Sequence, residues 1–280
     1  MLLRLQYVMV FLEMGKLSLD VYTLKLIAII NMGIHHTAMV LWDIFPLWVH
    51  ISLNVLRGIS FPIMAFLLVE GYRHSSSVKK YMLRLFIFAL AAQFPYMLAF
   101  GFFQLNIIFT ILLGLMILVL YDKLYVKDQK RGSFVVIFII ILIVSSPLIE
   151  SAFFGPLLIF MYHVIKDEKS RKTFPLVLFG SIMVSAQIFI RIFTPLLATM
   201  DLSDLLAGMP GMVHNELLLL QYYFFPIGIF LVIPLLLAYN GQQGRRIKYL
   251  FYAFYPLHFA ILAAIAYALG LIDLRIQTFW

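Results

Sequence analysis

The chain has 280 residues, of which 64% are hydrophobic and 12% carry a charge, and its mean hydropathy is +1.01. Because soluble domains contain about 25% charged residues, this composition excludes an ordinary soluble protein and predicts an all-α, polytopic membrane protein. The sequence has no cysteine, which excludes disulfides, a thiolate nucleophile and thiolate metal ligands. We interpret the net charge of +8 as a topological signal in the loops, with the lipid bilayer as partner and no nucleic acid.

Apolar runs divide the chain into about nine expected membrane-spanning helices. Residues 1–20 are expected to form an N-terminal interfacial segment, and residues 21–280 a single transmembrane domain. The fifth and sixth runs are short, and the alternative for them is a pair of half-helices around residues 145–147. In chain order the nine runs are 21–42, 47–71, 80–100, 105–121, 134–148, 152–165, 174–193, 217–239 and 249–269.

The loops between these runs alternate in charge. Basic side chains gather before the first run and after the second, fourth, sixth and eighth, whereas the loops in between carry mainly carboxylates. Since basic loops stay in the cytosol, we predict a cytosolic N-terminus and an external C-terminus. The basic residues that follow even-numbered runs are Arg73, Lys79, Lys80, Lys123, Lys127, Lys130, Arg131, Lys166, Lys169, Arg171, Lys172, Arg245, Arg246 and Lys248.

The stretch 61–84 carries the densest group of ionisable side chains beside an apolar run. Ionisable groups at or inside a membrane boundary cost free energy, so each of them is a functional hypothesis. Glu70 and His74 lie four residues apart and therefore share a helix face, and Arg84 lies about one turn inside the next run. A purely topological role is the equal alternative for the three cations nearest the loop, Arg73, Lys79 and Lys80.

Histidines on two distant runs are predicted at the same depth. At a rise of 1.5 Å per residue, the pair His35 and His36 lies roughly 15 Å beyond the inner boundary. His258 lies roughly 15 Å beyond the same boundary by the same rise. Only one of the adjacent pair can face a given site, because neighbouring helix residues point about 100° apart. The alternative for each histidine alone is an ordinary packed, hydrogen-bonded side chain.

A basic mouth that leads to an imidazole inside the membrane fits an acyl-coenzyme A donor. The phosphates would bind arginine and lysine at the mouth, and a histidine would act as general base toward an acceptor amine or hydroxyl. Composition equally permits a transporter of an anionic solute. The sequence lacks P-loop glycines, a His-Glu-x-x-His zinc motif and a Gly-x-Ser-x-Gly elbow, so no such motif decides between the two.

Five runs of the sequence carry a family resemblance: LKLIAIINMGIHHTAM, FPIMAFLLVEGYRHSSSVKKYMLRLFIFAL, LNIIFTILLG, IPLLLAYNGQQG and KYLFYAFYPLHF. They resemble the TraX family of integral-membrane proteins, over residues 24–261 and most weakly over 134–216. The resemblance rests on the runs FPIMAFLLVEGYRHS and FYPLH. It implies a membrane acetyltransferase of the bacterial cytoplasmic membrane, because the namesake of the family acetylates the amino terminus of pilin.

The resemblance also assigns roles to individual side chains. His36 matches the histidine of the family's first span, while His35 stands where the family typically has an aspartate. Gln93 stands where the family often has an acid. The other positions that match family motifs are Glu70, Tyr72, His74, Arg84, Asn106, Asn240 and His258.

The leading hypothesis is therefore an integral-membrane acetyltransferase that needs no metal. It would move an acetyl group from acetyl-CoA, its co-substrate, to a peptide or pilin amine or to another cell-envelope acceptor. The alternatives are a transporter or flippase for an anionic or envelope-precursor solute, and a non-enzymatic membrane partner. The expected catalytic residues are His36, His258 and Asn106. The expected donor-binding residues are Glu70, Arg73, His74, Lys79, Lys80 and Arg84. Supporting roles are expected for His35, Tyr72 and Asn240.

Overall fold

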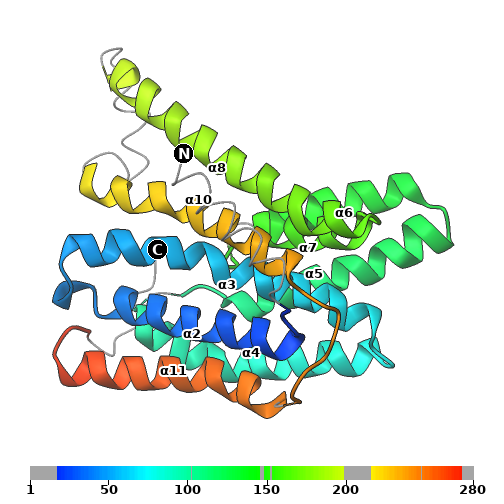
Figure 1. The fold of residues 1–280 in the computed structure, drawn as a ribbon, viewed down its shortest axis with the longest axis horizontal. Helices are drawn as coiled ribbons and strands as arrows, with labels where there is room; N and C mark the ends of the chain where they lie inside the picture. The colour runs from blue at the N-terminus through cyan, green and yellow to red at the C-terminus, as the bar shows by residue number, and fades with distance from the viewer. Residues whose placement is uncertain are drawn as a thin grey trace, which may run out of the picture.

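The computed structural model describes residues 18–101, 103–145, 148–151, 153–198, 216–246 and 248–272 (Figure 1). Within these ranges the chain is a bundle of helices, which confirms the predicted all-α class. A 3₁₀ turn, η1 (Trp42–Ile44), follows the helix that ends at Val40, and a π-helix, η2 (Tyr121–Lys127), continues directly from the helix that ends at Leu120. The α-helices are α2 (Val21–Val40), α3 (Leu47–Arg73), α4 (Val78–Phe100), α5 (Ile107–Leu120), α6 (Arg131–Ser145), α7 (Phe154–Val164), α8 (Glu168–Ala198), α10 (Glu216–Leu237) and α11 (Lys248–Ala268).

Each predicted apolar run corresponds to one of these helices. Most boundaries agree closely, and α8 extends beyond its predicted run at both ends. Capping side chains set several of the starts, because the first N–H groups of a helix have no intrahelical partner. Asp20 accepts a hydrogen bond of 2.7 Å from the Thr23 amide at the start of α2, and Asn106 accepts one of 3.0 Å from the Ile108 amide at the start of α5. The predicted interfacial segment lies almost wholly outside the described residues.

Five helical segments of the described chain are long and apolar enough to cross a membrane. The helices α6 and α7 have only 15 and 11 residues. At 1.5 Å per residue they measure about 22 and 16 Å, less than the hydrocarbon thickness of about 30 Å. These lengths favour the half-helix alternative for the fifth and sixth runs, while the number of complete spans and the cytosolic N-terminus stay predictions. The five segments are Val21–Val40, Trp48–Arg73, Val78–Phe100, Ile107–Lys127 and Glu168–Phe189.

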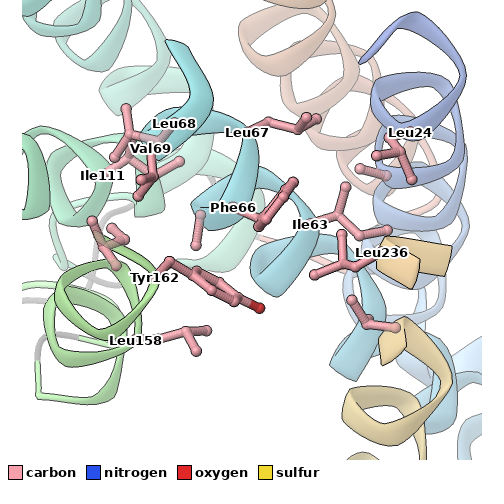
Figure 2. Packing of buried hydrophobic residues seen from close by; sticks show 14 of the residues in the cluster. Leu24, Ile63, Phe66, Leu67, Leu68, Val69, Ile111, Leu158, Tyr162 and Leu236 are labelled. Carbon is pink, nitrogen blue, oxygen red and sulfur yellow. The ribbon is translucent and has the colours of Figure 1, made fainter. Parts of the chain in front are cut away.

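Helix α3 lies at the centre of the bundle, between α2 and α10 (Figure 1). Its buried side chains, among them Ile63 and Phe66, join the larger hydrophobic cluster with Leu24 of α2, Tyr162 of α7 and Leu236 of α10 (Figure 2). Close approach of α3 and α10 depends on two glycines at their crossing, since a Cβ on either would collide with the backbone of the other helix. Those residues are Gly58 and Gly228.

A second hydrophobic cluster joins α4, α11 and the last turn of α2. Tyr96 of α4 packs edge-to-face on Phe259 of α11 with ring centroids 5.3 Å apart. Both α2 and α4 contribute buried side chains to the two clusters and so join them.

Backbone pairing and short connections define two ends of the bundle. Leu19, before α2, exchanges hydrogen bonds of 2.9 Å with Ala238 and Asn240, which follow α10. The loop 74–77 joins the end of α3 to the start of α4. We call this side, where α2, α4 and α11 start and α3 and α10 end, the basic end. At the opposite end, Leu105 pairs with the turn around Ile149, before α5 and α7.

Candidate active site

A cavity of about 1080 Å³ lies inside the bundle. Its volume is at the upper limit of the roughly 300–1,000 Å³ that is typical of small-molecule sites. The lining includes His74 and Arg245 at the basic end, and at the opposite end His36 near the end of α2 and Gln104 in the connection between α4 and α5. Because these residues come from opposite ends of the elements that carry them, the cavity extends along the helices from a basic mouth to a histidine-lined chamber.

Basic side chains surround the mouth of the cavity. Arg84, six residues into α4, is the deepest of the arginines there, and its Cζ lies 5.7 Å from the centroid of the Tyr81 ring. The Nε atom of Arg84 is buried and makes no hydrogen bond to the described part of the chain. A guanidinium with a buried, unpaired donor is suited to hold a phosphate oxygen. The other basic residues that line this part are Lys25, His74, Arg245 and Arg246.

Glu70 lines the same mouth, and an ion pair fixes its carboxylate. Arg171 Nη1 lies 2.7 Å from Glu70 Oε1, and the two side chains are only 3% and 12% exposed. Arg171 Nη2 lies 2.6 Å from Glu168 Oε2, and its guanidinium stacks over Phe66 at 5.0 Å. Tyr239 donates to Glu70 Oε2 at 3.4 Å. Glu70 is therefore held at the wall with its charge compensated.

The predicted histidines of α2 and α11 meet at the wall of the cavity, which His36 lines. His36 Nδ1 lies 2.8 Å from His258 Nε2, and the two rings stack with centroids 5.1 Å apart. His258 Nδ1 lies 2.9 Å from the Phe254 carbonyl oxygen, which can only accept, so Nδ1 carries the proton. His258 Nε2 then accepts, and His36 Nδ1 must donate to it. This leaves Nε2 of neutral His36 with a lone pair, the form that a general base needs.

Local sequence features bring these two helices together. Gly33 lies one turn before His36, and a Cβ there would be 3.2 Å from the Phe254 ring, so glycine lets α11 approach α2 closely. Pro256 lies two residues before His258 and has no amide hydrogen, which loosens the backbone hydrogen bonding of α11 at this level. His35, 6% exposed, also lines the cavity with its ring centroid 5.5 Å from that of His36.

The structure adds side chains to this chamber that the sequence analysis did not single out as site residues. Arg57 of α3 lines the cavity near the histidines, and Glu150, from the turn before α7, lines it as well. Arg57 is close enough to His35, His36 and Glu150 for its charge to act on each of them. Arg57 interrupts an apolar run, and that signal could have marked it as a functional candidate. The histidine chamber is defined by His35, His36, Arg57, Tyr96, Gln104, Glu150 and Tyr255.

Asn106, predicted to be catalytic, lies outside the lining of the cavity. Its side chain is fully buried at the start of α5, where it caps the helix and donates to the Ala89 carbonyl at 2.9 Å and to Gln93 Oε1 at 2.9 Å. We therefore assign Asn106 a structural role in joining α4 to α5. Gln93 completes this joint, since it also donates to the Gln104 carbonyl at 2.7 Å.

Several of the predicted donor-binding and supporting residues also lie beside the cavity rather than in its wall. Lys79 and Lys80 are exposed, and Arg73 donates to the His163 carbonyl at 3.1 Å. Tyr72 donates to Asp122 at 2.6 Å on the side of η2. Asn240 donates to Ser18 at 2.8 Å and so secures the chain before α2. The predicted residues that do line the cavity are His35, His36, Glu70, His74 and Arg84, and His258 reaches it through His36.

The helices and the cavity define the class of the molecule, an all-α membrane protein that encloses a polar chamber within its bundle. Residues 20–266 match the family model described as TraX protein, so the chain belongs to the TraX family. A relative from Dichelobacter nodosus is named "Probable fimbrial assembly protein FimC, serogroup H1". It is 26% identical over 266 residues, which cover 89% of this chain and 96% of the relative. No solved structure matches the chain.

Proposed function

We propose that this protein is a membrane acetyltransferase that moves the acetyl group of acetyl-CoA to an acceptor amine or hydroxyl. The observation that carries the proposal is the cavity itself, whose lining includes both the basic mouth and His36, the histidine for which the hydrogen bonds favour an unprotonated Nε2. A long, anionic donor with a reactive group at its far end fits this distribution of charge. The mouth and the histidine chamber would then hold the two ends of one molecule.

The donor would enter at the basic end. Its phosphates would bind Arg84, whose buried Nε makes no hydrogen bond to the described residues, together with Arg245 and Arg246. His74 lines the same wall, and the Glu70–Arg171 pair would keep that wall rigid without adding net charge. In this revised assignment, the exposed Lys79 and Lys80 contribute to the surface potential and make no direct contact with the donor.

Transfer would take place in the histidine chamber. The acceptor nitrogen or oxygen attacks the carbonyl carbon of the thioester, and its proton passes to His36 Nε2. The carbon–sulfur bond then breaks, and the proton is delivered to the departing thiolate, so that coenzyme A leaves as a thiol. His258 and the Phe254 carbonyl would orient the His36 ring and stabilise the imidazolium while it carries the proton.

The comparisons support a particular range of acceptors. The Dichelobacter nodosus relative is named as a probable fimbrial assembly protein, which favours a pilin or another secreted peptide. A cell-envelope molecule is the broader alternative. Either acceptor would be available to a protein of the bacterial cytoplasmic membrane, the location that we propose for this chain.

The second candidate is a transporter or flippase, and the length of the cavity favours it. Its lining reaches from the basic end to residues beside the turn before α7, as a solute path would. The two functions differ in their need for coenzyme A. A transporter would move its solute without acetyl-CoA and would tolerate a conservative change at His36.

Binding of acetyl-CoA to the full, detergent-purified chain tests the proposal, measured as a ligand-dependent rise in the thermal unfolding midpoint. The control ligand is coenzyme A without its 3′-phosphate. Saturable stabilisation by acetyl-CoA that weakens with the control ligand would support a donor site at the mouth. No stabilisation of well-folded protein would overturn the acetyltransferase proposal and leave transport as the function to pursue.

A further inference from the structure

We propose that Arg57 is a catalytic residue, whose guanidinium binds the acyl oxygen of the donor as negative charge develops on it. The inference rests on the proposed acetyl transfer. Arg57 matches none of the motifs that link the sequence to its family. The role of Arg57 is supported instead by the position of its side chain in the wall of the histidine chamber.

The position of Arg57 within the bundle is the first argument. It is the eleventh residue of the 27-residue helix α3 and thus lies well inside the element that forms the centre of the protein. An arginine at such a depth is rare and normally faces a polar cavity or a functional partner. Here Arg57 lines the cavity, and its guanidinium carbon Cζ lies 5.6 Å from the centroid of the Phe225 ring of α10.

The neighbours of Arg57 are the second argument. Arg57 lines the same cavity as His36, the proposed base, His35 and Glu150, and it is close enough to each of the three for its charge to reach them. A guanidinium inside the membrane costs free energy, so its place near the proposed base points to a task of its own. Stabilising an oxyanion is such a task.

The chemistry requires a group of this kind. When the acceptor attacks the thioester, the carbonyl carbon becomes tetrahedral and its oxygen becomes an anion. In the low-dielectric chamber that anion needs a preorganised donor. Arg57 supplies a fixed charge and several N–H groups. Tyr255 Oη, which is buried without a hydrogen-bond partner among the described residues, would be a second donor from the same wall.

Glu150 would act as a positioning residue for Arg57. It comes from the turn before α7, and the backbone pairing of that turn with Leu105 fixes its place. A carboxylate in the wall of the same cavity would attract the guanidinium and hold it in place. Glu150→Gln should therefore lower turnover less than the loss of Arg57 does.

The test is steady-state release of coenzyme A from acetyl-CoA by the full chain in detergent, with water and a short peptide with a free amino terminus as acceptors. A thiol-reactive dye can follow release directly, because the protein has no cysteine. We expect Arg57→Gln to lower turnover about 10²–10³-fold, with the dissociation constant of acetyl-CoA unchanged. Arg57→Lys, which keeps the charge, should recover part of the lost turnover, whereas Arg57→Met should recover none.

Arg131→Gln is the matched control, because Arg131 is exposed at the start of α6 and does not line the cavity. Unchanged turnover in Arg57→Gln would overturn the inference. So would an equal loss of acetyl-CoA affinity, since Arg57 would then bind the donor instead of the oxyanion. Should Arg57→Gln not fold, the Arg57→Lys variant decides, and wild-type turnover there would overturn a role for the planar guanidinium. If wild-type protein binds acetyl-CoA but releases no coenzyme A, the proposed function itself is wrong.

Discussion

His36 and His258 lie 222 residues apart in the sequence and are joined by a hydrogen bond of 2.8 Å between their rings. The other ring nitrogen of His258, Nδ1, donates a hydrogen bond of 2.9 Å to the Phe254 carbonyl oxygen. The family resemblance led us to expect an acid beside His36, where this chain has His35. In the proposed mechanism, a second imidazole and a backbone carbonyl would take the orienting positions that a carboxylate holds in a catalytic triad.

This relay predicts a graded response at His258. His258→Ala removes the acceptor for His36 Nδ1, and we expect turnover to fall about 10²-fold, the lower end of the range for general-base catalysis. His258→Gln should lose less, because its amide oxygen can still accept from His36. Steady-state kinetics of coenzyme A release measure both variants. Equal turnover in the alanine variant and the wild type would show that the relay has no role.

If the basic mouth of the cavity binds the phosphates of acetyl-CoA, Arg84→Ala should weaken the binding of acetyl-CoA selectively. A charge-assisted hydrogen bond contributes about 1.5–3 kcal/mol, so the dissociation constant of acetyl-CoA should rise at least about tenfold. Titration of the thermal unfolding midpoint with acetyl-CoA gives this constant. Lys79→Ala is the matched control, since Lys79 starts the same helix but is exposed and lies off the cavity. Equal weakening in both variants would indicate a general surface-charge effect.

The ion pair between Glu70 and Arg171 predicts a loss of stability that a double variant relieves. Arg171→Met removes the cation nearest to the Glu70 carboxylate and leaves it Arg73, whose Nη1 lies 3.9 Å from Glu70 Oε1. We expect a cost of about 3 kcal/mol, the lower end of the range for buried pairs. Glu70→Leu combined with Arg171→Met should recover much of this. Thermal unfolding in detergent measures each variant, with the exposed Lys169→Ala as control. A double variant less stable than either single one would contradict this account.

The helix crossing of α3 and α10 predicts opposite effects for two alanine substitutions. In Gly228→Ala the new Cβ would meet the Val55 carbonyl of α3, and forcing the helices apart should cost about 1–3 kcal/mol. Gly132→Ala on α6 meets nothing within 4 Å and should be neutral or stabilise by up to about 1 kcal/mol. Thermal unfolding of both variants checks the pair. A Gly228→Ala protein as stable as the wild type would mean that this crossing is looser than described.

The fold could be predicted largely from the sequence because each helix is a local apolar run. Asp20 and Asn106 each provide a capping oxygen at the start of such a run. The depth of His36 and His258 followed from the rise of a helix, and the structure brings the two rings into contact. Short α6 and α7 were recognisable from their runs, but whether they cross the membrane depends on packing that no local pattern records.

The site could be predicted only in part, because tertiary contacts decide what a polar side chain does. Asn106 matched a family motif, yet it caps a helix, a role that spacing cannot separate from catalysis. Arg171 was one more cation of a basic loop, although it is 3% exposed and pairs with Glu70. Glu150 was interpreted as a loop acid, and only the pairing of its turn with Leu105 places it in the chamber.

The most direct test of the account is the rate of coenzyme A release from acetyl-CoA by wild-type protein and by His36→Ala, measured beside acetyl-CoA binding. We predict that His36→Ala binds acetyl-CoA with wild-type affinity and loses about 10²–10⁴-fold in turnover, the range for removal of a general base. Wild-type turnover in His36→Ala, with the protein folded and acetyl-CoA bound, would contradict the central claim that this imidazole is the base.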